Sequence, residues 1–312
     1  MNETKEFPRS ESFNNESLIY FFKIFWLKKS LIILSVITFG IFGGVFSLFL
    51  PDVYKSEVVL SPTSSNSGDL SSLSQYAGIA AMAGISLPMS SNQDKTSEGL
   101  ETIRSFSFFK DYIAENDLFF KLMAPKGWDS IKDELLIDKG MFDTKNNKWV
   151  NTEKFSVNGK PSLQVAHEKF LENLEIKEDK RTNFISISFT HYSPNIAKEF
   201  LEFLISDINE KARREDIFTA EQTIKVLEEE FNKVQYLGVK TGISALIKRN
   251  IETISIAKST QQYLIKELSP AYAPEEKHRP QRLLIVFLFS LIGFIVVSIF
   301  VLYKEYFLKR KY

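Results

Sequence analysis

Two long runs without a charged residue constrain this chain more than any other feature of its sequence. Residues 30–51 carry no charged side chain over 22 positions, and residues 283–303 carry none over 21. A helix of about 20 apolar residues spans the hydrocarbon core of a bilayer. A core helix of a soluble protein usually keeps a polar face. The sequence therefore predicts two transmembrane helices, at 30–51 and 283–303.

The first run is predicted to be an uncleaved membrane anchor. Its apolar stretch is longer than the core of a signal peptide, and its exit, SLFLP, offers no small-x-small cleavage site. Trp26 precedes the first run, and Tyr303 and Tyr306 lie at the end of the second. Aromatic residues at these places are typical of the interfacial belt of a membrane protein.

Basic residues next to the two runs predict their orientation. Lys28 and Lys29 adjoin the first run, and the second is followed by Lys304, Lys309, Arg310 and Lys311. Short basic segments remain on the cytoplasmic side of a membrane. We therefore expect two cytoplasmic tails, residues 1–29 and 304–312, and a domain of residues 52–282 on the outer side.

Charge and cysteine content exclude several classes of function. The net charge of the chain is zero, divided into +1 for residues 1–29, −4 for residues 30–303 and +3 for residues 304–312. This distribution gives no surface for nucleic acid. The chain has no cysteine, which excludes thiol catalysis and disulfides and is compatible with an oxidising outer compartment.

The first half of the outer domain shows strand and helix patterns. Residues 53–60 alternate between apolar and polar side chains, which predicts a half-buried strand. Residues 97–120 place apolar side chains at helical spacing, which predicts one amphipathic helix, and residues 125–160 are typical of loops or a small hairpin. Residues 78–88, GIAAMAGISLP, are small and weakly apolar; they suit either a helical turn on the core or a segment that faces a partner.

The second half of the outer domain predicts a hairpin and a long helical arm. Residues 174–190 read as strand, turn and strand, with Ile185, Ile187 and Phe189 facing inward. Ser193 and Pro194 form a helix start, with serine as the N-cap. The helical pattern then continues over about 195–268. The order of elements predicts an α+β fold.

The predicted arm has a thin apolar stripe and two glycines. Gly238 and Gly242 are expected to break or kink it. A long helix of this kind usually needs partners along its length. Either it packs in a solvated helix pair within one protomer, or it contacts another copy of the chain. Candidates for contact with another copy are Ile196, Phe200, Leu204 and Ile208.

Glycines in the two apolar runs are candidates for helix packing in the membrane. Gly40 and Gly44 form a GxxxG pattern in the first run, and Gly293 lies in the second. Small residues at this spacing let helix backbones approach closely.

Three prolines stand directly before the second run. Pro270, Pro274 and Pro280 lie within residues 269–282. Proline fixes φ and supplies no backbone donor. We expect a stiff, non-helical connector that ends the arm and sets its angle to the second span.

Motifs that carry chemistry are missing from the sequence. It contains no GxxxxGK[ST], no HExxH and no GxSxG, and its three histidines are far apart. We therefore expect no catalytic, cofactor-binding or metal-binding residues, which favours a scaffold over an enzyme.

The pattern as a whole resembles the Wzz-type chain-length determinants, also called polysaccharide co-polymerases. The resemblance covers nearly the whole chain and rests on the two spans around one large domain and on the proline-rich segment before the second span. It rests also on three stretches: PDVYKSEVVLSP, GLETIRSFSFFKDYI and NFISISFTHYSPNIAKEFLEFLISDIN. In the second of these, Arg104 precedes the serine of the family's L-x-S-x-x-F helix, which departs from that pattern.

The resemblance implies a bacterial inner-membrane protein that does no catalysis. It implies a mixed α/β base next to the membrane, with a long helix extending away from it. It implies a ring-like homo-oligomer, a Wzy-type polymerase and a growing lipid-linked polysaccharide as partners. The short segment after the second span has no fused kinase, which points to the branch that acts on the O-antigen of lipopolysaccharide.

Three other functions remain open at this point. A two-span periplasmic sensor would need a cytoplasmic output module, which tails of 29 and nine residues do not supply. A polysaccharide export component is a further alternative. An enzyme acting on a periplasmic glycan would need paired carboxylates in one pocket.

Overall fold

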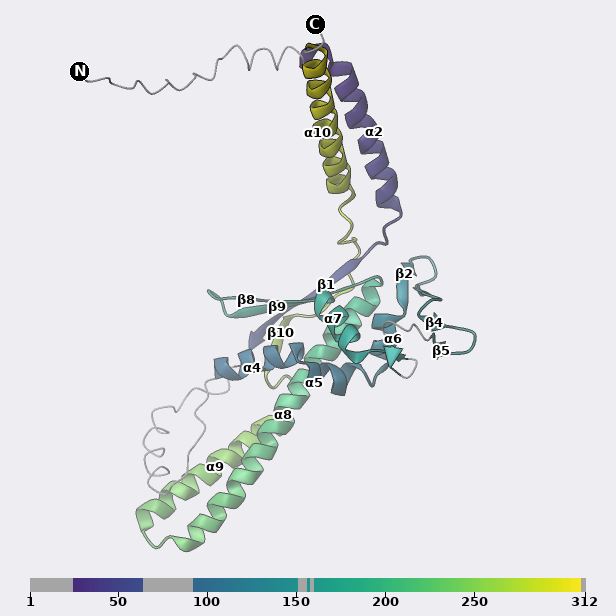
Figure 1. Cartoon of the computed structure of the whole chain (residues 1–312). Coiled ribbons are helices and arrows are strands. Elements are labelled where there is room, and N and C mark those ends of the chain that lie inside the picture. The colour runs from purple at the N-terminus through teal and green to yellow at the C-terminus, as the bar shows by residue number, and fades with distance from the viewer. Residues whose placement is uncertain (1–24, 64–91, 151–155, 158–159, 310–312) are drawn as a thin grey trace, which may run out of the picture. The chain divides into compact units, whose positions relative to one another are not determined.

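The structure is a computed structural model that describes residues 25–63, 92–150, 156–157 and 160–309. The predicted segment 78–88, residues 1–24 of the first tail and residues 310–312 of the second lie outside the described residues. The chain divides into two compact units (Figure 1). One contains Met1–Pro51 and His278–Tyr312, and the other contains Asp52–Lys277.

The first unit is a pair of long apolar helices. α2 is Lys29–Leu48 and α10 is Arg282–Lys309. Both are long and apolar enough to cross a membrane, and most of their side chains face outward. α2 lies within three residues of the first predicted span at each end, whereas α10 begins one residue before the second predicted span and continues six residues past it. α2 ends just before Pro51, which resists helix.

The second unit is built on one antiparallel sheet of four strands in the order β10-β1-β9-β8. Val58 of β1 lies opposite Ile187 of β9, which in turn lies opposite Ile176 of β8. Because side chains alternate between the two faces of a strand, this register collects the apolar residues on one face. The strands are β1 (Tyr54–Pro62), β8 (Leu174–Asp179), β9 (Phe184–His191) and β10 (Ile265–Ser269).

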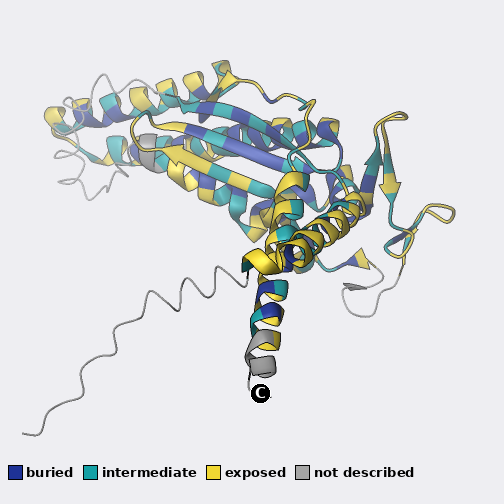
Figure 2. Ribbon diagram, turned by 90° about the horizontal axis from the view of Figure 1, so that it is seen from above, coloured by how far each residue is buried: buried dark blue, intermediate teal, exposed yellow. Residues whose placement is uncertain are grey.

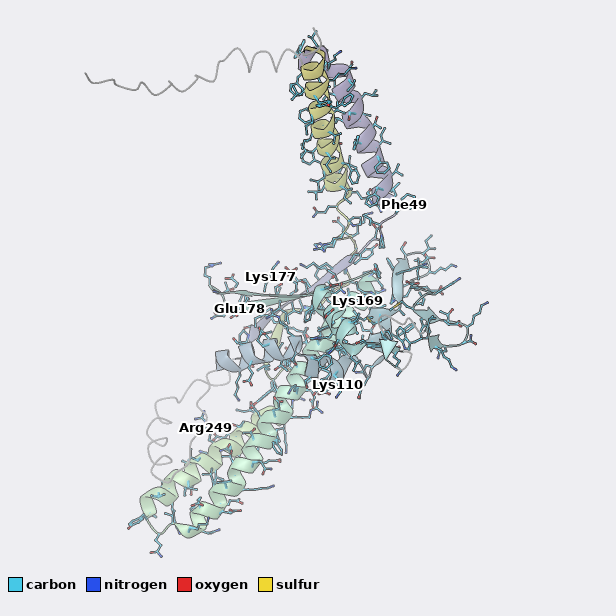
Figure 3. The ribbon with its side chains drawn as sticks, viewed as in Figure 1. Phe49, Lys110, Lys169, Lys177, Glu178 and Arg249 are labelled. Carbon is cyan, nitrogen blue, oxygen red and sulfur yellow. The ribbon has the colours of Figure 1, made fainter. Side chains whose placement is uncertain are left out.

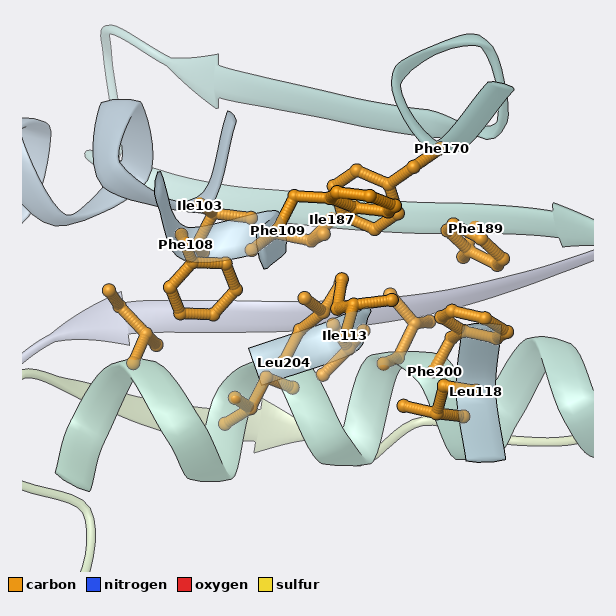
Figure 4. Close-up of a cluster of buried hydrophobic side chains, with 14 of the residues drawn as sticks. Ile103, Phe108, Phe109, Ile113, Leu118, Phe170, Ile187, Phe189, Phe200 and Leu204 are labelled. Atoms are coloured by element: carbon orange, nitrogen blue, oxygen red, sulfur yellow. The ribbon is translucent and has the colours of Figure 1, made fainter. Parts of the chain in front are cut away.

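Helices cover the apolar face of this sheet and enclose a core rich in phenylalanine (Figure 4). Phe189 of the sheet stacks on Phe200, with ring centroids 4.3 Å apart, and Phe170 packs on Phe189 at 5.9 Å. We call the sheet and its covering helices the base. Besides the first part of α8 (Pro194–Lys233), these helices are α4 (Asn92–Arg104), α5 (Phe106–Phe108), η2 (Phe109–Ile113), α6 (Asp117–Met123) and α7 (Leu163–Asn173).

The single helix predicted over 97–120 is instead a series of short helices. Ser105 adopts an extended backbone, and its hydroxyl accepts a hydrogen bond from the backbone N–H of Phe108. A serine side chain that caps in this way ends one helix and begins another. The restart turns Phe108 and Phe109 into the core, where both are at most 1% exposed.

Three two-stranded pairs fill the region predicted as loops or a small hairpin. Asp133 and Asn147 have positive φ, at 52° and 50°, at the turns of the first two pairs, where aspartate and asparagine tolerate the left-handed region. Helix α7 was not predicted. The pairs are β2 (Pro125–Asp129) with β3 (Glu134–Ile137), β4 (Phe142–Asp143) with β5 (Lys148–Trp149), and β6 (Ser156–Val157) with β7 (Lys160–Pro161).

The arm is a helical hairpin that consists of residues 210–233 of α8 and all of α9 (Leu237–Ser259). Its two helices pack through a small cluster of Leu227, Ile243 and Leu246. Figure 2 shows that burial is concentrated in the central strands of the base, whereas the arm is largely exposed or intermediate.

Two predictions about the arm are wrong. The break between its two helices lies at residues 234–236, where Val234 and Tyr236 have extended backbones. Gly238 and Gly242 lie inside α9 and do not interrupt it. The arm also ends at Ser259 rather than 268, because residues 265–269 pair with β1 as strand β10. Ile265 is 1% exposed there, so burial overrides the helical spacing.

Candidate functional site

Three polar residues on one face of α8 hold the segment that follows α9. Asn209, Arg213 and Asp216 are spaced four and three residues apart, so they lie on the same side of the helix. Each of them contacts residues 260–265, which lead from the arm into β10. We call Asn209, Arg213, Asp216 and residues 260–265 the clasp.

Asn209 is the buried centre of the clasp, at 3% exposed. Its amide nitrogen donates to the carbonyls of Ile205 (2.9 Å) and Ile265 (3.2 Å). Its amide oxygen accepts from the backbone nitrogens of Leu264 (2.7 Å) and Ile265 (3.1 Å). The side chain therefore satisfies backbone groups at the start of β10 that would otherwise be buried without partners.

Arg213 caps the C-terminal end of α9. Its Nη2 donates to the carbonyls of Thr260 (3.0 Å) and Gln261 (2.7 Å), and its Nη1 pairs with Glu210. Carbonyls at a helix C-terminus lack partners within the helix and carry partial negative charge. A cation at this place stabilises the point where the arm returns to the base.

Asp216 joins α8 to α4 of the base and to the segment that follows α9. It accepts a hydrogen bond from the Tyr263 hydroxyl (2.7 Å), and its two oxygens lie 2.9 and 2.8 Å from Lys95 Nζ on α4. Burial, together with the hydrogen bond to this carboxylate, raises the pKa of Tyr263. The phenol therefore stays a donor, and the contact persists across the physiological pH range.

The end of β1 completes the contacts of the clasp. The Thr63 backbone nitrogen donates to the carbonyl of Leu264 (3.1 Å), and its hydroxyl lies within hydrogen-bond distance of the carbonyls of Tyr263 (2.5 Å) and Leu264 (2.9 Å). β1, α4, α8 and β10 thus meet at the foot of the arm, and the direction of the arm depends on these polar contacts.

The connector is non-helical, but it follows a strand rather than the arm. Ala271 is buried in the core of the base, and the carbonyl of Tyr272 accepts a hydrogen bond from Ser56 Oγ (2.6 Å). Pro270, Pro274 and Pro280 all lie outside helices and strands. The expectation that the connector ends the arm is therefore wrong, because β10 lies between Ser259 and Pro270.

The glycines of the apolar runs lie where α2 and α10 pack together within one chain. A Cβ added at Gly40 would lie 2.8 Å from Ser290 Oγ, and one added at Gly293 would lie 2.8 Å from Phe39 Cβ. Gly44 leaves ordinary space, with Val286 at 3.8 Å. Gly43, which sequence reasoning did not single out, is as close as the others, at 2.7 Å from Phe289 Cβ.

The residues proposed for contact with another copy of the chain belong to the core of the protomer. Phe200 and Leu204 are 0% exposed and Ile208 is 2% exposed, while Ile196 packs against the same cluster. This prediction is wrong because the apolar face of α8 is covered by the sheet of its own chain. The large apolar side chains that the arm does expose are Phe218, Val226, Tyr236, Leu237, Ile251 and Ile256.

His191, at the end of β9, is a neutral structural residue. Its Nδ1 accepts from the backbone nitrogen of Ser193 (3.1 Å), so its Nε2 is the nitrogen that donates to the carbonyl of Lys121 (2.9 Å). Burial lowers the pKa of His191 to about 4. Among the described residues no group of three or more histidine, cysteine or acidic side chains is placed to hold a metal ion.

Comparison with known proteins gives one family. Residues 15–116 match the Wzz family of chain length determinant proteins, which confirms the resemblance seen in the sequence. This part of the chain contains α2, β1, α4, α5 and η2. No curated protein matches the chain by sequence.

Two solved structures are similar to this one at low identity. A full-length bacterial polysaccharide co-polymerase has 10% identity and a TM-score of 0.39, over 93% of this chain and 97% of that chain. A fragment of WzzB, a polysaccharide co-polymerase from Salmonella Typhimurium, has 9% identity and a TM-score of 0.30, over 73% of this chain and 99% of that chain.

Proposed function

We propose that this chain, whose residues 15–116 match the chain length determinant family, regulates how many repeat units are joined in a surface polysaccharide, the O-antigen of lipopolysaccharide. The family match is the observation that carries the proposal. Two candidate membrane helices, on either side of the α+β domain in the chain, support it.

In this proposal the chain is a scaffold, and the bond-forming chemistry belongs to a Wzy-type polymerase. The chain would contact both the polymerase and the growing lipid-linked polysaccharide. A scaffold must hold its contact surfaces in a constant geometry. The clasp supports this role, because Asn209, Arg213 and Asp216 fix the position at which the arm leaves the base.

The proposed location is the bacterial inner membrane, with both termini in the cytoplasm and residues 52–282 in the periplasm. The basic residues beside both apolar runs support this orientation. Reporter fusions at Ser67 and Tyr312 test it. We expect periplasmic activity from the first fusion and cytoplasmic activity from the second; equal periplasmic activity at both sites would contradict the orientation.

The same proposal includes a ring-like homo-oligomer. Its support is the arm, whose exposed apolar side chains include Phe218 at 64% and Val226 at 52%. A helix pair of this kind gains stability when a neighbour covers those side chains. Mass measurement of the purified protein in detergent tests this, and a strict monomer at all concentrations would count against a ring.

Gene deletion followed by electrophoresis of the surface polysaccharide tests the function. A length regulator changes only the distribution of chain lengths, whereas an enzyme changes the composition and a sensor changes the amount. Loss of the modal length, with restoration by the wild-type gene, is the expected result. An unchanged distribution of lengths in the deletion strain would overturn the proposal.

Two adjacent arginines provide matched variants for the same gel. Arg213→Ala removes the cap on the carbonyls of Thr260 and Gln261, so we expect a shifted modal length. Arg214 has a side chain 58% exposed, and its contacts with Glu210 and the Tyr112 hydroxyl lie at the surface, where such contacts contribute little, so Arg214→Ala serves as the control with a nearly normal ladder. Equal ladders from both variants at equal protein levels would show that the clasp plays no part in length control.

A further inference from the structure

The turn of the β2–β3 hairpin presents one isoleucine to solvent. Ile131 is 94% exposed, the largest exposed fraction of any large apolar side chain in the described part of the chain. Hydrogen bonds hold the turn: the Asp129 carboxylate accepts from the backbone nitrogens of Ile131 (2.9 Å) and Lys132 (3.4 Å). Turn residues are usually polar. This turn instead holds an apolar side chain in a fixed position with almost no cover from the base.

Contacts within the base place this turn where β1 and α8 begin. Asp133 accepts hydrogen bonds from Trp128 Nε1 (2.9 Å) and from Asn195 Nδ2 (2.9 Å) in the first turn of α8. The ring of Trp128 packs edge-on against Tyr54, the first residue of β1, with centroids 5.4 Å apart. Figure 1 shows the turn after β2 on the side of the base where β1 begins. We call Tyr54, Trp128, Asp133 and Asn195 the entry corner.

The chain joins both candidate membrane helices to the base beside the entry corner. Asp52, two residues before Tyr54, pairs with Lys277 at 3.4 Å. Four positions separate Asp52 from the last residue of α2, and five separate Lys277 from the first residue of α10. An extended chain covers about 14 Å over four residues and about 18 Å over five. These short joins keep the entry corner close to a bilayer that α2 and α10 span.

The chemistry of the hairpin fits a lipid surface better than a protein. One isoleucine is too small a patch for a protein interface, which needs about 1,000 Å² or more. A bilayer needs less, because the short joins already hold the hairpin beside it. Trp128 and Tyr54 next to the turn are typical of the membrane–water interface. Residues 125–137 contain two basic and three acidic side chains, a net charge of −1, so the contact is apolar rather than electrostatic.

We propose that Ile131 inserts into the outer surface of the bilayer that α2 and α10 span. The inference rests on the membrane location in the proposed function, and it adds a lipid contact made by the base itself. Insertion of one side chain reaches the boundary between headgroups and acyl chains, not the centre of the bilayer. The contact adds to the two covalent joins and limits the tilt of the base against the bilayer.

Fluorescence quenching in the full-length protein tests the insertion, because the chain has no native cysteine. Ser130→Cys, next to Ile131, carries an environment-sensitive fluorophore, and the purified protein is placed in phosphatidylcholine vesicles with nitroxide quenchers on the lipid chains. The control label is Gln235→Cys, next to Tyr236 and Leu237, which are both 80% exposed. It lies at the far end of α8, about 60 Å of helix from the entry corner.

We expect lipid quenching at Ser130→Cys to be about tenfold stronger than at Gln235→Cys. Adding Ile131→Ser to the Ser130→Cys variant should lower the quenching to the level of the control, because the serine has no apolar surface to bury. The fold should persist, since Ile131 makes almost no buried contact. Equal quenching at the two labels would overturn the contact, and unchanged quenching in the Ile131→Ser variant would overturn the role of this side chain.

A label at Phe49→Cys separates failure of this inference from failure of the membrane location. Phe49 directly follows α2 and is 83% exposed (Figure 3). Strong quenching at Phe49→Cys without quenching at Ser130→Cys would overturn the insertion and leave the location intact, whereas no quenching at either would overturn both.

The lipid composition tests whether the contact is apolar. Vesicles that contain phosphatidylglycerol should give the same quenching at Ser130→Cys as phosphatidylcholine alone, because the hairpin carries no net positive charge. A requirement for the anionic lipid would show that lysines rather than Ile131 make the contact, and would overturn the proposed insertion.

Discussion

Helix α8 belongs to two regions that are stabilised in different ways. Its first 16 residues, in the base, contain eight buried residues, whereas the 24 residues that continue into the arm contain two. The base half lies under the sheet and packs into a cluster that includes five fully buried phenylalanines. The arm half packs its apolar side chains mainly against α9, and its contacts with the base are polar, such as the ion pair of Asp216 with Lys95. The position of the first half of this uninterrupted helix is therefore fixed by packing in the core, whereas most side chains of its second half remain accessible for contact with other molecules.

This difference explains why polar groups gather at the junction. Beyond Ile208, α8 leaves the main core of the base, and only two further apolar residues of the helix are buried. The hydrogen bonds of Asn209, Arg213 and Asp216 begin at the next residue and continue for two turns. Hydrogen bonds are directional, so a few of them can define a geometry that a thin apolar stripe cannot.

The largest expected effect is loss of a phenylalanine in the base. Phe200→Ala removes a ring that is 0% exposed and stacks on Phe189. We expect the free energy of unfolding to fall by about 3–5 kcal/mol, because the cavity cannot collapse around a sheet. Denaturant unfolding of the purified protein, followed by tryptophan fluorescence, measures this change.

The matched control lies on the same helix in the arm. Phe218 is 64% exposed, so Phe218→Ala should change the free energy of unfolding by no more than about 0.5 kcal/mol. Equal losses of unfolding free energy for the two variants would show that the arm is packed as tightly as the base, which would contradict the difference between the two regions.

The next effect concerns the junction itself. Asn209→Ala leaves the backbone nitrogens of Leu264 and Ile265 without their buried acceptor, and each such loss costs about 1–3 kcal/mol. We expect faster amide hydrogen exchange in residues 264–269, with the rest of the sheet still protected. Asn250 is a half-buried asparagine on α9 whose amide makes one bond, to the carbonyl of Leu246, so Asn250→Ala should leave that exchange unchanged.

Some features of the base could be predicted from the sequence because they depend only on residues that are close together in the chain. The alternation of Ile185, Ile187 and Phe189, and the cap at Ser193, were predictable because each depends on neighbours in the sequence. Even there, Ser188, which alternates with these inward-facing residues and so belongs to the other face of β9, is only 4% exposed, because β1 and β8 lie on both sides of it.

Other features depend on residues that are distant in the sequence. β10 forms because Asn209 and β1 hold it, although its own five residues, IKELS, have no strong strand pattern. The clasp was missed for the same reason, since its partners lie about 50 residues apart. A signal was nevertheless present: Asn209 is an amide on the apolar face of a helix, at helical spacing from Leu201 and Ile205.

A smaller effect follows from His191 and the pH. Unfolded histidine binds a proton near pH 6.5, whereas burial lowers the pKa of His191 to about 4 in the folded base. The unfolded state therefore binds more protons between these values, so stability is complete above about pH 6.5 and falls as the pH drops toward 4. We expect a loss of about 2 kcal/mol between pH 7.5 and pH 5 from this group.

Unfolding of the base at the two pH values measures that loss. Glutamine does not titrate, so a His191→Gln variant should lose this part of the pH dependence while other acid effects remain. The arm carries none of the three histidines, so its hydrogen exchange should not follow the same titration. The same pH dependence in His191→Gln would show that another group is responsible.

The smallest expected effect on stability is at the connector. Pro270→Ala, Pro274→Ala and Pro280→Ala together touch neither the core of the base nor the apolar faces of α2 and α10, because all three prolines lie outside helices and strands. Alanine favours helix over proline by about 3 kcal/mol per site in a helix interior, yet burial of Ala271 and the hydrogen bond to the Tyr272 carbonyl oppose a helix there. We expect a change in unfolding free energy below about 1 kcal/mol.

The functional effect of the same variant should be much larger than its effect on stability. Proline limits the conformations of the connector, so replacing three prolines gives the backbone of this segment more freedom. A scaffold that sets chain length through a fixed geometry would then produce a broader ladder of polysaccharide lengths at a normal protein level. The ladder, read beside an immunoblot for the protein, measures this outcome. An unchanged modal length at a normal level would show that the prolines act only as a spacer, and that the geometry relevant to function is set within the base and the arm.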